Sequence, residues 1–235
     1  MTHTNRAHFL LESCTLVHYQ ISFHKCNSVA MQAETLTPLH LASLEGHLDQ
    51  VVSLLGQGHD VNAVCHDARY RYWTPLHCAS WHDHFEVVQV LVKHGANLDL
   101  QNARGFTALN AAAWKGYENI AKYLLHQGAN PNLSSTEGYT PLMSACLKSG
   151  YEVVLLLLEK GADVNMVQDG GWTALHAAAE KCGVLEMLMM VKHGANLAEF
   201  GASALEVARS RNNFQMVGYL EGLLGAAAAP NHPVQ

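Results

Sequence analysis

A four-residue motif recurs six times along this chain of 235 residues. Successive copies start 37, 33, 33, 33 and 30 residues apart. The copies are Thr37–His40, Thr74–His77, Thr107–Asn110, Thr140–Met143, Thr173–His176 and Ser203–Glu206. Self-similarity at an interval near 33 residues predicts a solenoid, in which one supersecondary unit is repeated and contacts only its neighbours.

Each copy of the motif carries the signals of a helix start. Thr or Ser is a favoured N-cap, and the Pro that follows it in three copies has a preset φ and no N–H group to leave unpaired. A glycine stands 21 residues after the motif Thr in the first five copies, where a second helix is expected to end. Apolar residues at helical spacing, such as Val87, Val88 and Leu91, predict the buried face of that second helix.

These motifs resemble the ankyrin-repeat family. The resemblance rests on Thr-Pro-Leu-His, on Gly161–Asn165, and on an alanine two residues after the motif at Ala42, Ala79, Ala112, Ala145 and Ala178. It covers about residues 34–224. It implies an all-α solenoid of helix-turn-helix pairs with β-hairpin tips, about six repeats, and binding of other proteins on a concave face.

The resemblance also sets the domain boundaries that we predict. Repeats start near residues 34, 70, 103, 136, 169 and 199, and together they form one domain over residues 34–224. Residues 1–33 are an extension outside the repeats, with disorder as one interpretation, and residues 225–235 are a disordered tail. The sixth copy has Glu206 in place of the motif His and is expected to cap the stack.

Composition narrows the class of partner and the compartment. A net charge of -6 argues against a general nucleic-acid binder, which needs excess Lys and Arg to neutralise phosphates. The six cysteines form no C-x-x-C pair, as expected for reduced thiols in an intracellular protein of the cytoplasm or nucleus. No apolar run reaches the roughly 18 residues of a membrane span. We expect a protein or peptide partner, no small-molecule substrate, no cofactor and no metal. The spacing of a zinc finger is not matched by Cys14, His18, His24 and Cys26.

Aromatic residues gather at two positions that line the binding face of the family. One position directly precedes the motif, and the other lies seven residues after its start. All four tryptophans fall on them, and the enlarged loop before the second motif adds Tyr72. Trp and Tyr are enriched at binding hot spots, so we predict an aromatic contact surface. Its members are Tyr72, Trp73, Trp81, Phe106, Trp114, Tyr139 and Trp172. Structural packing against the next hairpin is an equal alternative for Phe106, Tyr139 and Trp172.

Basic residues follow the same pattern. Eight residues after the motif start stand His82, Lys115, Lys148 and Lys181, and three residues before it stand Arg71 and Arg104. A basic stripe beside aromatic side chains favours a partner with acidic groups. The alternative is that a Lys at a helix end is favoured by the helix dipole alone.

The predicted function is a protein-interaction module of the scaffold or adaptor kind. One alternative is a stoichiometric inhibitor or targeting subunit of a partner enzyme. An alternative of another class is an enzyme with a cryptic site at His77 and Cys78, the one adjacent pair of a possible base and nucleophile. We predict no enzymatic activity and no catalytic residue, because Cys78 is expected on the inner face of a helix and no third group completes a triad.

Overall fold

A computed structural model describes residues 36–66, 69–148 and 150–228 of the chain, with the side chains of residues 226–228 left out. This part is all helical, and no strand occurs in it. The first helices of the repeats are α3 (Pro38–Glu45), α5 (Pro75–Trp81), α7 (Ala108–Lys115), α9 (Pro141–Lys148), α11 (Ala174–Lys181) and α13 (Leu197–Ser210). The second helices are α4 (Leu48–Gly56), α6 (Phe85–Lys93), α8 (Glu118–His126), α10 (Tyr151–Glu159), α12 (Val184–Lys192) and α14 (Phe214–Ala228).

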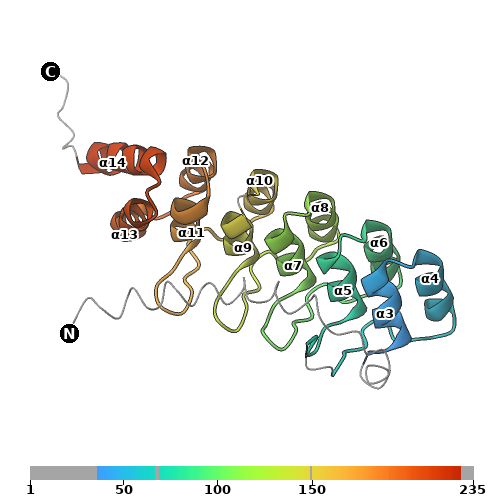
Figure 1. Cartoon of the computed structure of the whole chain (residues 1–235). Helices are drawn as coiled ribbons and strands as arrows, with labels where there is room; N and C mark the ends of the chain where they lie inside the picture. The colour runs from blue at the N-terminus through green and yellow to red at the C-terminus, as the bar shows by residue number, and fades with distance from the viewer. Residues whose placement is uncertain (1–35, 67–68, 149, 229–235) are drawn as a thin grey trace. The chain divides into compact units, whose positions relative to one another are not determined.

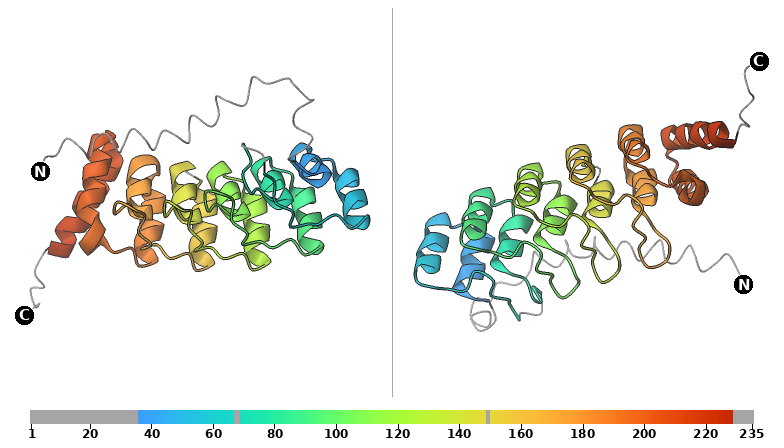
Figure 2. Two further views of the ribbon diagram at one scale, coloured as in Figure 1. Left: turned by 90° about the horizontal axis from the view of Figure 1, so that it is seen from below. Right: turned by 180° about the vertical axis from the view of Figure 1, so that it is seen from behind.

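The helices form two layers within the unit that begins at Thr35. Helices α3, α5, α7, α9, α11 and α13 lie side by side in one layer, and their partners lie in the other (Figure 1). The loops that lead from one repeat to the next project beyond the layer of first helices, as the two further views also show (Figure 2). The predicted repeat solenoid is confirmed. The predicted extension, residues 1–33, lies outside the described residues.

The predicted helix starts are confirmed where Thr opens the motif in the first four repeats. The hydroxyl of Thr37, Thr74, Thr107 and Thr140 accepts a hydrogen bond from the backbone N–H three residues on, at 3.2 to 3.4 Å. The Leu of the motif then points inward in each of the first five repeats and is no more than 1% exposed. The cap therefore sets the helix register that buries the core.

The sixth repeat departs from the prediction. Ser203 does not cap a helix but lies inside α13, which starts six residues earlier. Asn196 is the cap instead, and its side chain accepts from Glu199 N at 3.2 Å. The connection is three residues shorter here, so the chain runs directly into the helix without forming a loop tip.

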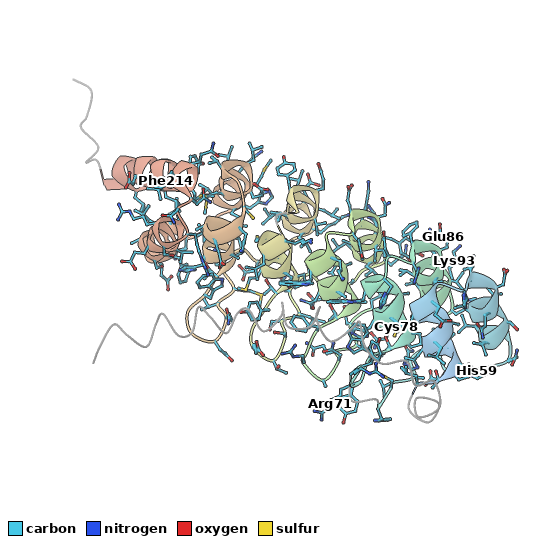
Figure 3. The ribbon with its side chains drawn as sticks, viewed as in Figure 1. His59, Arg71, Cys78, Glu86, Lys93 and Phe214 are labelled. Carbon is cyan, nitrogen blue, oxygen red and sulfur yellow. The ribbon has the colours of Figure 1, made fainter. Side chains whose placement is uncertain are left out.

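The C-terminal boundary also needs a correction. The predicted disordered tail began at residue 225, yet α14 continues to Ala228. Alanine has the highest helix propensity, so the run after Gly225 extends the helix. Residues 229–235 lie outside the described part. Phe214, in the first turn of α14, is 77% exposed (Figure 3). In the described part, no helix is long and apolar enough to cross a bilayer.

The β-hairpin form that we predicted for the loop tips is not shown, and the described residues of the tips form hydrogen-bonded turns. Asn102 N donates to Phe106 O at 2.9 Å, Ser135 N to Tyr139 O at 2.9 Å, and Gln168 N to Trp172 O at 2.8 Å. Neighbouring tips are joined by Ala103 N to Arg71 O at 3.0 Å and by Thr136 N to Arg104 O at 2.9 Å. Few bonds link each pair of arms, and no strand is found in the parts of the tips that the structure describes.

Candidate functional site

The motif histidines hold the loops that carry the predicted aromatic residues. His40 Nε2–H donates to Trp73 O at 3.0 Å, and His77 Nε2–H donates to Phe106 O at 2.9 Å. The tautomer of His77 follows from its other nitrogen, because Nδ1 accepts from Thr74 N at 3.2 Å. These histidines are therefore structural, and each one positions the residue that precedes the next motif.

Trp73 is the predicted contact residue that the structure places in the interior. It is 7% exposed and packs with Tyr70 in a small cluster that also holds Leu36 and Cys78. The rings of Trp73 and Tyr70 meet edge to face, with centroids 5.3 Å apart. The enlarged loop folds back over Trp73, so its ring contributes to packing and is withdrawn from the surface.

The other aromatic residues that precede a motif are half-buried. Trp172 stacks on His176, with ring centroids 5.1 Å apart. Burial raises the pKa of the Tyr139 phenol, and so do nearby carboxylates of Glu137 and Glu180. Tyr139, which packs against the main core, and Trp172 thus have packing roles, which favours the structural alternative for these two residues.

The exposed predicted residues of the loops are Arg71, Tyr72 and Arg104. Arg71 lies at the tip of the loop that leads into α5 (Figure 3). Tyr72 is 45% exposed, and its ring meets the His66 ring edge to face at 5.6 Å. Its φ of 61° lies in the left-handed region, which is uncommon for a residue other than glycine. The loop tip thus presents a basic and an aromatic side chain to solvent, and its predicted role in binding stays a prediction.

Trp81 and Lys115 form the best-defined contact on the face of the first helices. The Lys115 ammonium lies 4.4 Å from the centre of the Trp81 ring, within the range of a cation–π interaction. Trp81 in turn packs edge to face on Trp73, with centroids 5.7 Å apart. Trp81 and Trp114 are half-buried, not fully exposed.

Lys148 occupies on α9 the position that Lys115 occupies on α7, and its stem passes over Gly116. A Cβ added to Gly116 would lie 3.6 Å from Lys148 Cγ. Partial burial lowers the pKa of Lys115, and the positive charge of Lys148 lowers it further. Among the described residues, neither ammonium has an ion pair. Two cations therefore stand close together without a counter-charge from the residues that the structure describes.

His82 lies beside this pair at the end of α5. Its ring stacks on His84, with centroids 6.2 Å apart and planes 14° from parallel. The Nε2 atom is enclosed and has no hydrogen-bond partner in the described part of the chain. Burial lowers the pKa of His82 to about 4, and the positive charges of His84 and Lys115 act in the same direction. His82 is neutral at pH 7.

The basic stripe does not continue into the last two repeats. Glu180 lies 3.0 Å from the Arg211 guanidinium and 3.7 Å from the Lys181 ammonium. Its carboxylate is largely shielded from solvent and offsets one of these two positive charges, so the stripe is less basic here than predicted. Glu180 is not among the predicted site residues. It stands seven residues after a motif start, where other repeats carry Trp81 and Trp114. The negative charge of Glu180 beside the predicted basic stripe is the sequence signal that could have identified it.

The structure thus brings together one basic–aromatic cluster, which consists of Trp81, His82, Trp114, Lys115 and Lys148. All five residues lie at the ends of the first helices in repeats two to four. Arg71, Tyr72 and Arg104 lie apart from it on the loop tips. Trp73 lies beneath it, and Lys181 is paired elsewhere.

The His77 and Cys78 pair does not have the geometry of a nucleophile and base. Cys78 is 0% exposed, and burial raises the pKa of its thiol well above the ordinary value. Both ring nitrogens of His77 are occupied, by Thr74 N and by Phe106 O. A reactive cysteine needs an accessible thiolate, so this pair belongs to the core. Across the described residues, no three His, Cys, Asp or Glu side chains gather as metal ligands.

Comparison with known families agrees with this architecture. A family model described as ankyrin repeats (3 copies) matches residues 3–102, 39–135 and 99–168. A second model, described as ankyrin repeat, matches residues 170–199. The first match begins at residue 3, within the segment that we predicted to lie outside the repeats.

Proposed function

Since this chain belongs to the ankyrin-repeat family, we propose that its basic–aromatic cluster binds an acidic segment of a partner protein. Ankyrin repeats are generally protein–protein interaction modules, and their stacked helices offer an extended surface to a partner. The family does not say which surface or which partner chemistry this chain uses, because function depends on the site rather than the fold.

The Lys115 ammonium above the Trp81 ring is the observation that carries the proposal. The ring holds the cation in place and partly removes it from water, so a bound carboxylate loses less entropy in ordering that side chain. Lys148 adds a second positive charge close by. A partner carboxylate would supply the counter-charge that the described residues leave out.

Aromatic area beside the charges supports a protein partner. Trp81 and Trp114 present half-exposed rings, and Trp is among the residues that contribute most at interfaces. The whole chain carries a net charge of -6, so long-range attraction for a polyanion such as nucleic acid is weak. A short acidic segment with apolar residues between its carboxylates fits both features of the cluster.

A labelled peptide of alternating glutamate and leucine tests this proposal by fluorescence anisotropy, with a peptide of alternating glutamine and leucine as control. Changing both Lys115→Gln and Lys148→Gln should weaken binding of the glutamate peptide by about tenfold, as expected for the loss of two charge contacts. The matched control is Lys122→Gln with Lys160→Gln, because both residues are exposed on the second-helix side.

The control pair should stay within about twofold of the natural chain. Both double variants should melt within a few degrees of the natural temperature, since exposed charges contribute little and the cation–π contact of Lys115 contributes about 0.5 to 1 kcal/mol. Equal binding of the two peptides, or equal loss in the two double variants, would contradict the proposal.

A further inference from the structure

The ring of His82 is held in a fixed place next to the two lysines. His84 Nε2–H donates to Leu44 O at 2.9 Å, which fixes the ring on which His82 stacks. The fit beneath His84 is close, because a Cβ added to Gly46 would lie 2.5 Å from His84 Nδ1. Repeat one therefore holds His84, His84 supports His82, and Lys115 approaches from repeat three.

The surroundings of His82 contain few groups that could stabilise a proton on it. Its own turn provides Asp83, which is exposed, and His84. Helix α7 provides Lys115, which repels a second positive charge. On α3 the equivalent position is Glu45, but its carboxylate pairs with His47 at 3.2 Å. The ring has positive neighbours on one side and a carboxylate that is already paired on the other.

We propose that a partner carboxylate binds at Lys115 and Lys148 together with a proton taken up by His82, which makes the cluster an acid-strengthened carboxylate site. This inference rests on the proposed function, since it needs an acidic segment in the cluster. It adds the regulation of that site. The partner's negative charge offsets the positive charge of Lys115 and gives the protonated His82 ring a counter-charge that the described residues do not supply.

The direction of the pH effect follows from linkage. The free protein keeps His82 neutral down to about pH 4, because its pKa is lowered to about 4 there. A bound carboxylate raises that pKa. At a pH between the pKa of His82 in the free protein and its pKa in the complex, the complex therefore holds a proton that the free protein lacks. Affinity therefore increases as pH falls. A return to the ordinary value of about 6.5 predicts binding about tenfold tighter at pH 5.5 than at pH 7.5.

The test measures binding of the glutamate–leucine peptide to the full chain at pH 5.5 and pH 7.5, with folding verified by circular dichroism at each pH. The natural chain should bind about tenfold tighter at the lower pH. His82→Gln should reduce this ratio to less than about twofold. The matched control is His126→Gln, an exposed histidine on α8, which should keep the full ratio.

A second measurement does not depend on a variant that folds. The His82 ring is titrated by NMR in the natural chain, with and without the glutamate peptide. The midpoint should move upward by about two pH units when the peptide is bound. An unchanged midpoint, or a tenfold pH ratio that survives His82→Gln, would overturn proton uptake at His82.

These outcomes separate the two proposals. Binding that requires Lys115 and Lys148 but has the same affinity at both pH values would leave the acidic-segment site intact and refute the proton linkage. Glutamate and glutamine peptides that bind equally at both pH values would refute both proposals.

Discussion

The junction between repeats two and three differs from the junction between repeats three and four in how it holds the next loop. At the first junction, His77 reaches from α5 to the carbonyl of Phe106. At the second, Asn110 stands in the place of the His. Its Oδ1 accepts from Thr107 N at 2.9 Å, so the helix cap is kept, but its Nδ2 is buried and has no partner among the described residues.

Two other side chains bond to loop carbonyls at the second junction and replace the missing bond of the motif His. Gln101 Nε2 donates to Ser134 O at 2.8 Å, and the Thr136 hydroxyl donates to Arg104 O at 3.1 Å. A Cβ added to Gly105 would lie 2.5 Å from Thr136 N. The comparison shows that the motif His performs two separable tasks, capping its own helix and holding the next loop. Asn performs only the first, because its side chain is shorter.

Gly105→Val is expected to have the largest effect, because it removes what holds the second junction. Gly105 has φ 76°, which a β-branched residue adopts only with strain, and the added Cβ meets backbone that cannot rotate away. The free energy of unfolding should fall by about 4 kcal/mol. Denaturant unfolding gives this value directly.

Gly128→Val is the control for that change. Gly128 has φ 94°, but nothing lies within 4 Å of its added Cβ, so only strain remains and about 1 to 3 kcal/mol should be lost. Equal losses at the two glycines would show that close packing of the loop tips contributes nothing to the second junction.

Lowering the pH should destabilise the first junction, because His77 must then take up a proton. Burial, the main cause, lowers the pKa of His77 to about 4 in the folded chain, whereas the unfolded chain has the ordinary value of about 6.5. The unfolded chain thus binds more protons between these values, so stability is full above pH 6.5 and is lost as pH falls toward 4. The loss through His77 from pH 7 to pH 5 should be about 2 kcal/mol.

The variant that isolates this contribution is His77→Asn, which reproduces the side chain at position 110. It should retain the cap, start from a lower stability at pH 7, and lose about 2 kcal/mol less than the natural chain on acidification. Parallel pH profiles for the two chains, measured by thermal or urea unfolding, would assign the acid sensitivity to other groups.

Asn110→His should have the smallest effect and the opposite sign. The longer side chain can keep the bond to Thr107 and also reach the carbonyl of Tyr139, as His77 reaches that of Phe106. A buried donor without a partner then gains one, so the chain should become about 1 kcal/mol more stable. A loss of stability, or unchanged hydrogen exchange at the loop of residues 135–139, would show that the two junctions are not interchangeable.

Much of the fold could be predicted because its causes are local. A Thr hydroxyl reaches a backbone N–H three residues away, and a left-handed glycine ends the helix that precedes it, so Thr107 and Gly128 mark helix ends in any context. Ser203 misled the prediction for a related reason. A serine can also lie inside a helix and donate to a carbonyl in the preceding turn, as Ser203 does to Phe200 O at 3.0 Å.

The residue types of the candidate site could be predicted from the sequence, but the net charge along its basic stripe could not. The repeat interval placed Trp81, Lys115, Lys148 and Lys181 on one face, because equivalent positions in a solenoid line up. Trp73 was included with them, although the enlarged loop buries it. No local rule shows which aromatic residue a loop of unusual length will cover.

The charge state of the stripe depends on pairs of residues about one repeat apart. Lys115 meets the ring of Trp81, 34 positions earlier, and Arg211 meets the carboxylate of Glu180, 31 positions earlier. The contact with Trp81 leaves the charge of Lys115 without a counter-charge among the described residues, whereas the contact with Glu180 neutralises the charge of Arg211. Lys115 and Arg211 nevertheless occupy the same position of the repeat. Coulomb energy falls with distance and with exposure to water, so the charge balance of the stripe is determined only when neighbouring helices have packed.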